Sequence, residues 1–349
     1  MTGKHLVVFI HGFEGTDRDF DNAERAFHRF FSAKNRTAET LTTLKVKGNA
    51  GIAGTYDGIE KGAVRIWREV MDEIARLGDS LKALSIVGHS LGGLYARYVV
   101  RLLDDCFVFE KCEPRVFVTL ATPHLSVRRP QTTPLNVVFQ QVAKKICATA
   151  RELCLEDDSK SPLLFRMTQP SFVDVLKKFR RRVLYANVSN DFQVHYSTAS
   201  ISTFNPYNRD ASRTKRSTEY PDLTDWSLAS VHARLRHENA EEVEAFARSD
   251  VYRPFLRQMF ERLNSLQWER YDAMFLTVFA HEQIINKRSV FAGREVIRHL
   301  LNHVFTEAES RVELPLRRSP SLDNQREEED GKQATEAVVR LSQLYVSQI

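Results

Sequence analysis

Residues 81–97 read LKALSIVGHSLGGLYAR, and this stretch decides the fold. Its first seven residues form a largely apolar run that is typical of a buried strand. Residues 88–92 then satisfy the pattern G-x-S-x-G, and a helical pattern follows over 91–103. A serine placed between a strand and a helix is the setting of a nucleophile elbow. The stretch therefore predicts an α/β sheet with Ser90 at its carboxyl edge.

The neighbouring segments alternate between strand-like and helix-like patterns. Residues 64–77 carry apolar side chains at helical spacing, and residues 295–305 form an amphipathic closing helix. Short apolar or alternating runs predict five further strands, at 6–10, 41–47, 116–121, 183–188 and 275–279. Strands that alternate with helices favour a mostly parallel sheet with right-handed crossovers.

The chain divides into a long α/β domain at 1–306 and a tail at 307–349. Within the domain, residues 127–182 have helical patterns without a strong strand and predict a helical cap insertion, and the polar residues 203–225 predict a mobile loop. The tail holds nine acidic and six basic residues and has a net charge of −3. Residues 1–306 therefore have a net charge of +8, and the whole chain +5. We expect a largely disordered tail with a terminal helix over 338–349.

Composition and charge exclude several classes of protein. Hydrophobic residues make up 42% and charged residues 27%, which is typical of a globular protein. The basic excess is spread along the chain, so we expect no nucleic-acid partner, whereas contact with an anionic membrane surface stays open. The four cysteines have no spacing typical of a disulfide framework or a zinc site. The first apolar run is too short for a secretory signal, and no stretch approaches the ~20 apolar residues of a membrane span. We expect a cytoplasmic protein, and peripheral association with a membrane stays open.

A serine nucleophile needs a base and an acid, which follow it along an α/β-hydrolase chain in the order acid, then histidine. Asp191 follows the predicted strand 183–188 and is the predicted acid, and His281 follows the predicted last strand and is the predicted base. Weaker alternatives are His299 and His303 in the closing helix, and Asp157, Asp158 and Asp174 in the predicted cap.

The tetrahedral intermediate of acyl transfer also needs hydrogen-bond donors for its oxyanion. The backbone amides of Phe13, which follows the first strand, and of Leu91, which follows the nucleophile, are the predicted donors. The residues expected to brace these loops or to line the pocket are His11, Gly12, His89 and His124.

The sequence resembles the serine esterase family of eukaryotic α/β-hydrolases that includes the fungal Rog-type lipases and plant homologues. The resemblance runs from about residue 6 to residue 305. Beyond the elbow it rests on ATPHL at 121–125, SPLL at 161–164 with Met167, LYANV at 184–188 with Asp191, and AH at 280–281.

The resemblance implies the nucleophile at Ser90, the acid at Asp191 and the base at His281, in agreement with the assignment from chain order. Two departures affect the predicted pocket rim: Ser126 stands where the family usually has glycine, and His195 where a proline is common.

A serine lipase or esterase is the function that these observations predict. The resemblance implies acyl esters of glycerolipids or phospholipids as substrates, and the mechanism needs no metal or organic cofactor. Alternatives are an acyl-thioesterase with the same triad and a non-catalytic lipid-binding or scaffold protein. The apolar cap residues are either an acyl-chain channel or plain core: Leu135, Val137, Val138, Phe139, Leu163, Leu164, Phe165 and Met167.

Overall fold

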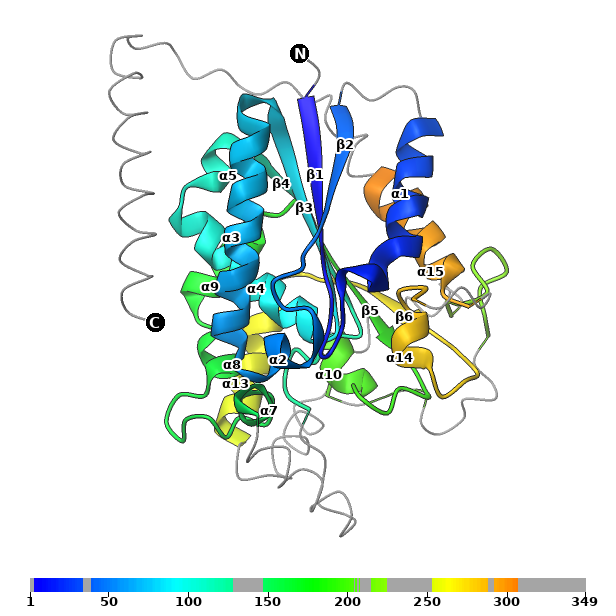
Figure 1. The fold of residues 1–349 in the computed structure, drawn as a ribbon. Coiled ribbons are helices and arrows are strands. Elements are labelled where there is room, and N and C mark those ends of the chain that lie inside the picture. Colours follow the sequence, from blue (N-terminus) through cyan, green and yellow to red (C-terminus); the bar gives the residue numbers. More distant parts are fainter. Residues whose placement is uncertain are drawn as a thin grey trace. The chain divides into compact units, whose positions relative to one another are not determined.

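The computed structural model describes residues 3–33, 39–127, 147–203, 205, 207, 215–224, 253–287 and 292–306 (Figure 1). The chain divides into two compact units, Met1–Glu309 and Ser310–Ile349, and every described residue belongs to the first. Three predicted features lie wholly or partly outside the described residues: positions 128–146 of the cap, positions 204, 206, 208–214 and 225 of the loop, and the tail.

One parallel sheet organises the described part of the chain. Its strands are β1 (Gly3–Ile10), β2 (Glu39–Lys45), β3 (Leu81–His89), β4 (Glu113–Leu120), β5 (Arg181–Asn187) and β6 (Glu269–Ala273), in the order β2-β1-β3-β4-β5-β6. Every neighbouring pair is parallel, so all the strands end at the same edge. The predicted parallel α/β sheet is therefore confirmed.

Helices cover both faces of the sheet (Figure 1). One face carries α3 (Ile59–Leu77), α4 (Leu91–Asp105), α5 (Val108–Lys111), α9 (Pro170–Lys178) and α13 (Arg253–Asn264). The other carries α1 (Asp21–Ala33), α14 (Ala280–Gln283), α15 (Arg294–His299) and its π-helical continuation η5 (Leu300–Phe305). The remaining short elements are η1 (Asp17–Phe20), α2 (Gly51–Tyr56), η2 (Gly78–Ser80), α7 (Ala148–Leu153), α8 (Leu163–Arg166) and α10 (Tyr196–Ser200). No helix of the described residues is both long and apolar enough to cross a bilayer.

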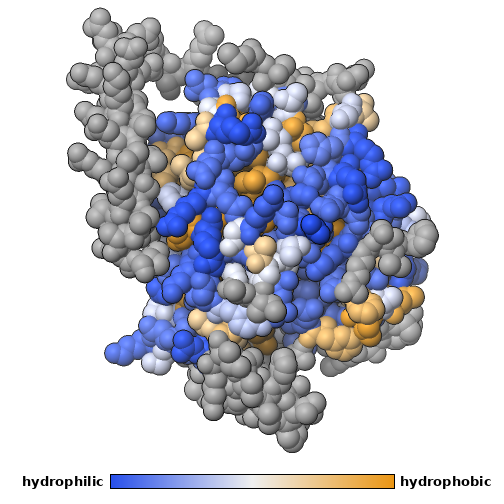
Figure 2. Space-filling model, viewed as in Figure 1, coloured by the Kyte–Doolittle hydropathy of each residue, from blue (hydrophilic) through white to orange (hydrophobic). Residues whose placement is uncertain are grey.

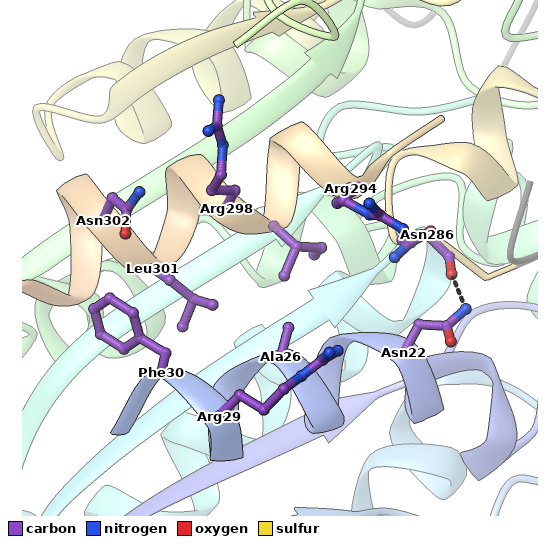
Figure 3. A pocket seen from close by; sticks show the side chains of 10 residues that line it. Asn22, Ala26, Arg29, Phe30, Asn286, Arg294, Arg298, Leu301 and Asn302 are labelled. Carbon is purple, nitrogen blue, oxygen red and sulfur yellow. Dashed lines mark hydrogen bonds between the residues drawn. The ribbon is translucent and has the colours of Figure 1, made fainter. Parts of the chain in front are cut away.

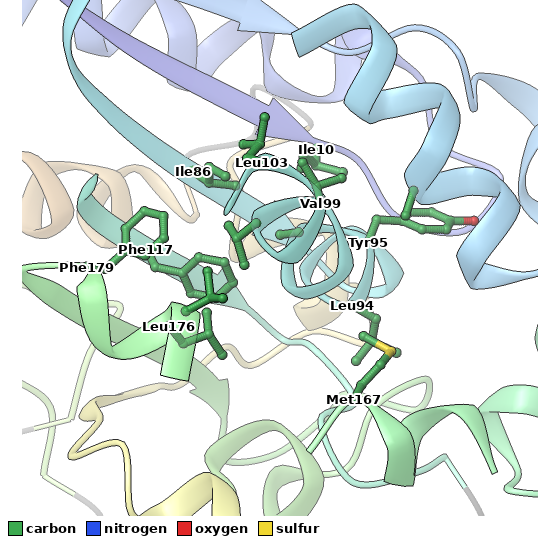
Figure 4. Packing of buried hydrophobic residues seen from close by; sticks show 14 of the residues in the cluster. Ile10, Ile86, Leu94, Tyr95, Val99, Leu103, Phe117, Met167, Leu176 and Phe179 are labelled. Atoms are coloured by element: carbon green, nitrogen blue, oxygen red, sulfur yellow. The ribbon is translucent and has the colours of Figure 1, made fainter. Parts of the chain in front are cut away.

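The strands are apolar on both faces because each face packs against helices. Along β1, Leu6 and Val8 belong to the core beneath α3 and α4, whereas Val7 and Phe9 belong to the core beneath α1 and α15. The continuous apolar runs in the sequence reflect this burial on two sides. Figure 4 shows the first of these cores gathered around α4.

The predicted cap differs from the structure at its C-terminal end. Leu176 and Phe179 at the end of α9 are buried in the core around α4, so α9 is a crossover helix that covers the sheet. Leu164 and Met167 are fully buried in the same core, which favours the plain-core alternative over an acyl-chain channel for these residues. The predicted channel residues at 135–139 lie outside the described residues.

The predicted last strand at 275–279 is wrong. The last strand is β6, which reads ERYDA and carries charged residues because it lies at the edge of the sheet. Its Glu269 pairs with Arg181 of β5 across the two strands. A strand whose charged residues pair with residues of the neighbouring strand needs no apolar run. Hydrophobicity alone therefore does not reveal it.

Part of the predicted mobile loop packs beside β6. Leu223 forms a β-bridge with Ala273, and the Thr224 amide donates to the Asp272 carbonyl. The Tyr220 and Leu223 side chains are buried. Residues 215–224 therefore extend the folded edge of the sheet.

A substitution at Phe27 tests the packing of the core beneath α1 and α15. Its side chain is fully buried and meets the rings of Phe9 and Phe305 edge to face, at centroid distances of 5.2 and 4.9 Å. Phe27→Ala is expected to lower the free energy of unfolding by ~3–5 kcal/mol, because it removes a buried ring and leaves a cavity. Phe107→Ala, at a 55% exposed ring, is the control. Denaturant titration measures both, and equal losses would contradict the predicted packing.

Candidate active site

The turn between β3 and α4 holds Ser90 in a rare backbone conformation. Its φ of 54° and ψ of −127° lie outside the conformations that side-chain-bearing residues usually adopt. The Ser90 amide donates to the Leu120 carbonyl at 2.9 Å, which ties the turn to the next strand. Ser90 therefore stands at the carboxyl edge of the sheet, directly before the first residue of a fifteen-residue helix.

Two glycines let other backbone segments approach this turn. A Cβ on Gly92 would lie 2.1 Å from the Ile10 carbonyl oxygen, and a Cβ on Gly12 would lie 2.8 Å from the Ser90 Cβ and 3.3 Å from its Oγ. Such distances exclude any side chain at either position. The loop after β1 thus lies against the serine. This closeness is required of a loop that donates hydrogen bonds to a carbonyl reacting with Ser90.

The loops after β5 and β6 bring a carboxylate and an imidazole together. His281 Nδ1 donates to Asp191 Oδ2 at 2.9 Å, and both side chains are buried. Asn187 Nδ2 donates to the same oxygen at 2.8 Å, and the amides of Gln193 and Val194 donate to Oδ1. Burial by itself raises the pKa of Asp191, but these bonds, led by the one from His281, outweigh it and leave the pKa below its usual value. The carboxylate is therefore ionised at neutral pH.

His89 holds the base in place through its backbone. Its Nε2 donates to the His281 carbonyl at 2.7 Å, and the two rings lie 4.8 Å apart. Burial, and then the proximity of His281, lowers the pKa of His89 well below its ordinary value, so the ring is neutral. The residue before the nucleophile thus fixes the loop that carries the imidazole.

His11 and His124 also lie where they support loops. His11 is buried, and its Nδ1 donates to the Gly12 carbonyl at 3.1 Å within the turn after β1. The His124 side chain is fully buried, with its Nε2 2.9 Å from Thr119 Oγ1 and its ring against Trp268. It therefore braces the loop after β4 from inside, and its role as a pocket-wall residue stays a prediction.

Arg97 is a buried support that the sequence analysis missed. Its guanidinium is fully buried and donates to the carbonyls of Met167 at 2.7 Å and His124 at 3.3 Å. Burial lowers its pKa to about 9. No local pattern marked this role, because its bonds reach carbonyls 27 and 70 positions away in the sequence.

The alternative bases and acids lie elsewhere. The His299 ring is buried at 2.7 Å from the Tyr185 hydroxyl, and His303 contacts the Tyr220 hydroxyl at 3.1 Å. Asp157 and Asp158 accept backbone amides of their own loop, and Asp174 pairs with Lys177. None of these groups contacts Ser90, Asp191 or His281 in the described part of the chain.

A brace from α2 onto the loop after β1 was also not foreseen. The Phe13 ring stacks on Tyr56 at 4.9 Å, and the Tyr56 hydroxyl donates to Glu14 Oε1 at 2.5 Å. The Glu14 amide donates to Thr55 Oγ1 at 3.2 Å. These contacts join residues about forty positions apart, so no local sequence motif predicts them.

A cavity of about 400 Å³ lies away from this site, between α1 and α15 (Figure 3). Its lining includes Arg29, Arg294 and Arg298, and the Asn22 side chain donates to the Asn286 carbonyl at one end. Ser90, Asp191 and His281 are not among the lining residues. The candidate site is therefore an arrangement of loops at the sheet edge and is distinct from this cavity.

A parallel sheet with a strand, serine and helix elbow defines an α/β-hydrolase. Comparison with family models adds a second result: residues 1–203 match the family described as "Putative serine esterase (DUF676)". The chain belongs to this family, which confirms the resemblance. The match covers the elbow and Asp191 but ends before His281.

Curated relatives carry lipase names. The chain is 29% identical over 204 residues to "Putative lipase ROG1" and 32% identical over 202 residues to "Putative lipase YDL109C", both from Saccharomyces cerevisiae. These matches cover 57% and 56% of the chain but only 28% and 30% of the relatives, so the chain matches less than a third of their length. Among solved structures it is similar to the peroxisomal α/β-hydrolase Lpx1 of the same yeast, at 12% identity and a TM-score of 0.47, over 97% of this chain and 84% of the other.

The buried neutral His89 predicts a pH dependence of stability. In the unfolded chain its pKa is about 6.5, whereas burial depresses it in the folded protein, so stability falls as the pH drops below about 6.5. His89→Gln keeps a donor for the His281 carbonyl and removes the titration. Its free energy of unfolding should therefore fall less steeply between about pH 6.5 and 5.5, by up to ~1.4 kcal/mol per pH unit. Denaturant titrations at both pH values measure this, and an unchanged slope would contradict a neutral buried ring.

Proposed function

We propose that this chain is a serine lipase or esterase that hydrolyses carboxylic esters through an acyl-enzyme intermediate. The observation that carries the proposal is the buried Asp191–His281 pair at the edge where the elbow places Ser90. Membership of the serine esterase family supports the same class of reaction. The nucleophile, acid and base follow the chain order of α/β-hydrolases.

In the proposed mechanism the Ser90 hydroxyl attacks the ester carbonyl while His281 Nε2 takes its proton. The proton then passes to the leaving alkoxide. In the second half, water attacks the acyl carbonyl while the same nitrogen takes its proton; the bond to the Ser90 oxygen breaks, that oxygen regains the proton, and the carboxylic acid leaves. Within the described residues the Ser90 hydroxyl makes no hydrogen bond to His281. Such bonds are often long before substrate binds and tighten in the reactive complex.

Asp191 orients the imidazole and stabilises its charged form in this scheme. The Nδ1–H bond to Asp191 selects the tautomer whose Nε2 can accept a proton. Because the pKa of Asp191 is lowered, the carboxylate stays negative when the neighbouring ring becomes positive. Transfer of a proton to His281 is thereby favoured in the transition state.

The amides of Phe13 and Leu91 are the proposed oxyanion donors. Neither amide donates a hydrogen bond within the described residues, and Leu91 is the first residue of α4, where a helix leaves its N–H groups unpaired. The loop of Phe13 touches Ser90 through Gly12. These observations support the two amides as the donors to the oxyanion.

The proposed substrates are acyl esters of glycerolipids or phospholipids. Support comes from the family and from the lipase names of the relatives, of which the chain matches less than a third. Hydrolysis of a panel of such lipids, compared between the wild type and Ser90→Ala, tests the substrate class. The cytoplasmic address and the peripheral membrane contact stay predictions.

Labelling by a fluorophosphonate probe tests the triad. The wild type should form an adduct at Ser90, and Ser90→Ala should form none. Asp191→Asn should slow ester turnover by roughly 10⁴, because the amide no longer holds the imidazole in its reactive tautomer. Asp174→Asn, at a 61% exposed carboxylate on α9, is the matched control and should retain turnover. Rapid turnover by Asp191→Asn would assign the acid role to another residue.

Tyr56 tests the proposed oxyanion loop. Tyr56→Ala removes the stack on Phe13 and the bond to Glu14, whereas Tyr56→Phe removes only the bond. Turnover of a water-soluble ester should fall by roughly tenfold in kcat for Tyr56→Ala and less for Tyr56→Phe, with KM nearly unchanged, because the donor position matters most in the transition state. A change confined to KM or to the unfolding midpoint would argue against positioning by Tyr56.

A further inference from the structure

Exposed apolar side chains gather around the candidate active site. The large apolar residues exposed in the described part of the chain are Phe13, Phe107, Phe192, Leu276, Val278 and Phe279. All but Phe107 lie on the loops after β1, β5 and β6, which also carry the proposed oxyanion, acid and base residues. Phe107 follows α4 and precedes β4, at the opposite edge of the sheet.

The loops after β5 and β6 form one surface. Asn190 Nδ2 donates to the Phe275 carbonyl at 2.7 Å, and His281 bonds to Asp191 one position further on. These two links place Phe192 beside the segment of Leu276 and Val278, which are 62%, 76% and 62% exposed. Figure 2 shows an apolar area at the lower right, where Figure 1 places α14 and the loop that precedes it.

The same loops offer almost no charge to water. Residues 189–197 read SNDFQVHYS and residues 273–281 read AMFLTVFAH, without lysine, arginine or glutamate. The one aspartate is Asp191, which is buried and bonded to His281. Moving this surface into an apolar medium would therefore strip water from no exposed fixed charge, and such desolvation is the main cost of entering a lipid layer. A protein partner would not require this lack of charge.

We propose that Phe192, Leu276 and Val278 dock the chain on a phospholipid bilayer by inserting into its interfacial layer. Docking would turn the carboxyl edge of the sheet toward the lipid, so that an acyl ester reaches Ser90 without crossing water. The inference rests on the proposed function for its purpose, because a lipid surface is where such an ester resides. It rests on the exposed loops alone for its physical basis.

Vesicle flotation tests the docking surface. The protein carries Ser90→Ala, so that lipid is not consumed, and the vesicles are neutral phosphatidylcholine. Leu276→Ser together with Val278→Ser should weaken partitioning by roughly tenfold or more, since two apolar groups are lost from the lipid contact. Phe107→Ser, at the opposite edge, should partition as the parent does. Binding should persist in about 0.5 M NaCl, which screens attraction by basic residues.

Turnover of a water-soluble short-chain ester, with Ser90 intact, separates this proposal from the proposed function. The variant at 276 and 278 should keep that turnover, which also shows that it is folded. Equal vesicle binding by this variant and its parent would overturn the docking surface, and so would an equal loss of binding in Phe107→Ser. In either case, ester turnover would still support the proposed hydrolase. Vesicle binding that depends on 276 and 278 without any ester turnover supports docking and overturns the hydrolase.

Discussion

The positive φ of Ser90 is the constraint on which the rest of the site depends. A non-glycine residue in such a conformation costs of order 1–3 kcal/mol, so the surrounding structure must enforce it. Here the enforcement comes from the Leu120 carbonyl on one side and from β1 on the other, where Gly92 permits contact with Ile10. The sheet order β1-β3-β4 therefore fixes the serine from both neighbouring strands.

An ionised carboxylate inside the protein has to be matched by donors on every side. Asp191 accepts from one imidazole, one amide side chain and two backbone amides, and all but the imidazole come from its own loop and from the end of β5. Three of the four hydrogen bonds to the Asp191 carboxylate therefore do not depend on His281. His281 completes the set, and the neutral His89 fixes its backbone without adding a second positive charge.

The sequence predicts the central strands of this sheet better than the edge strand β6. β1, β3, β4 and β5 are buried on both faces, so their apolar runs are visible, whereas β6 satisfies its polar residues through partners such as Arg181 and leaves no such run. Chain order pointed to the Asp191–His281 pair because the carboxyl ends of parallel strands meet at one edge. Arg97 and Tyr56 were missed because their roles consist of bonds and stacking with distant residues, which leave no spacing in the sequence.

The parallel pairing of β5 with β6 separates the chemistry of the site from the surface around it. Both loops start from strands whose register is set by five paired positions, and Asn190 joins them again at Phe275. Asp191 and His281 are then held inward by their mutual bond, whereas the side chains of Leu276 and Val278 are largely exposed. Residues outside the bonded positions can therefore change in polarity without moving the imidazole. The surface that meets the substrate's surroundings and the groups that cleave the ester are physically separable on the same two loops.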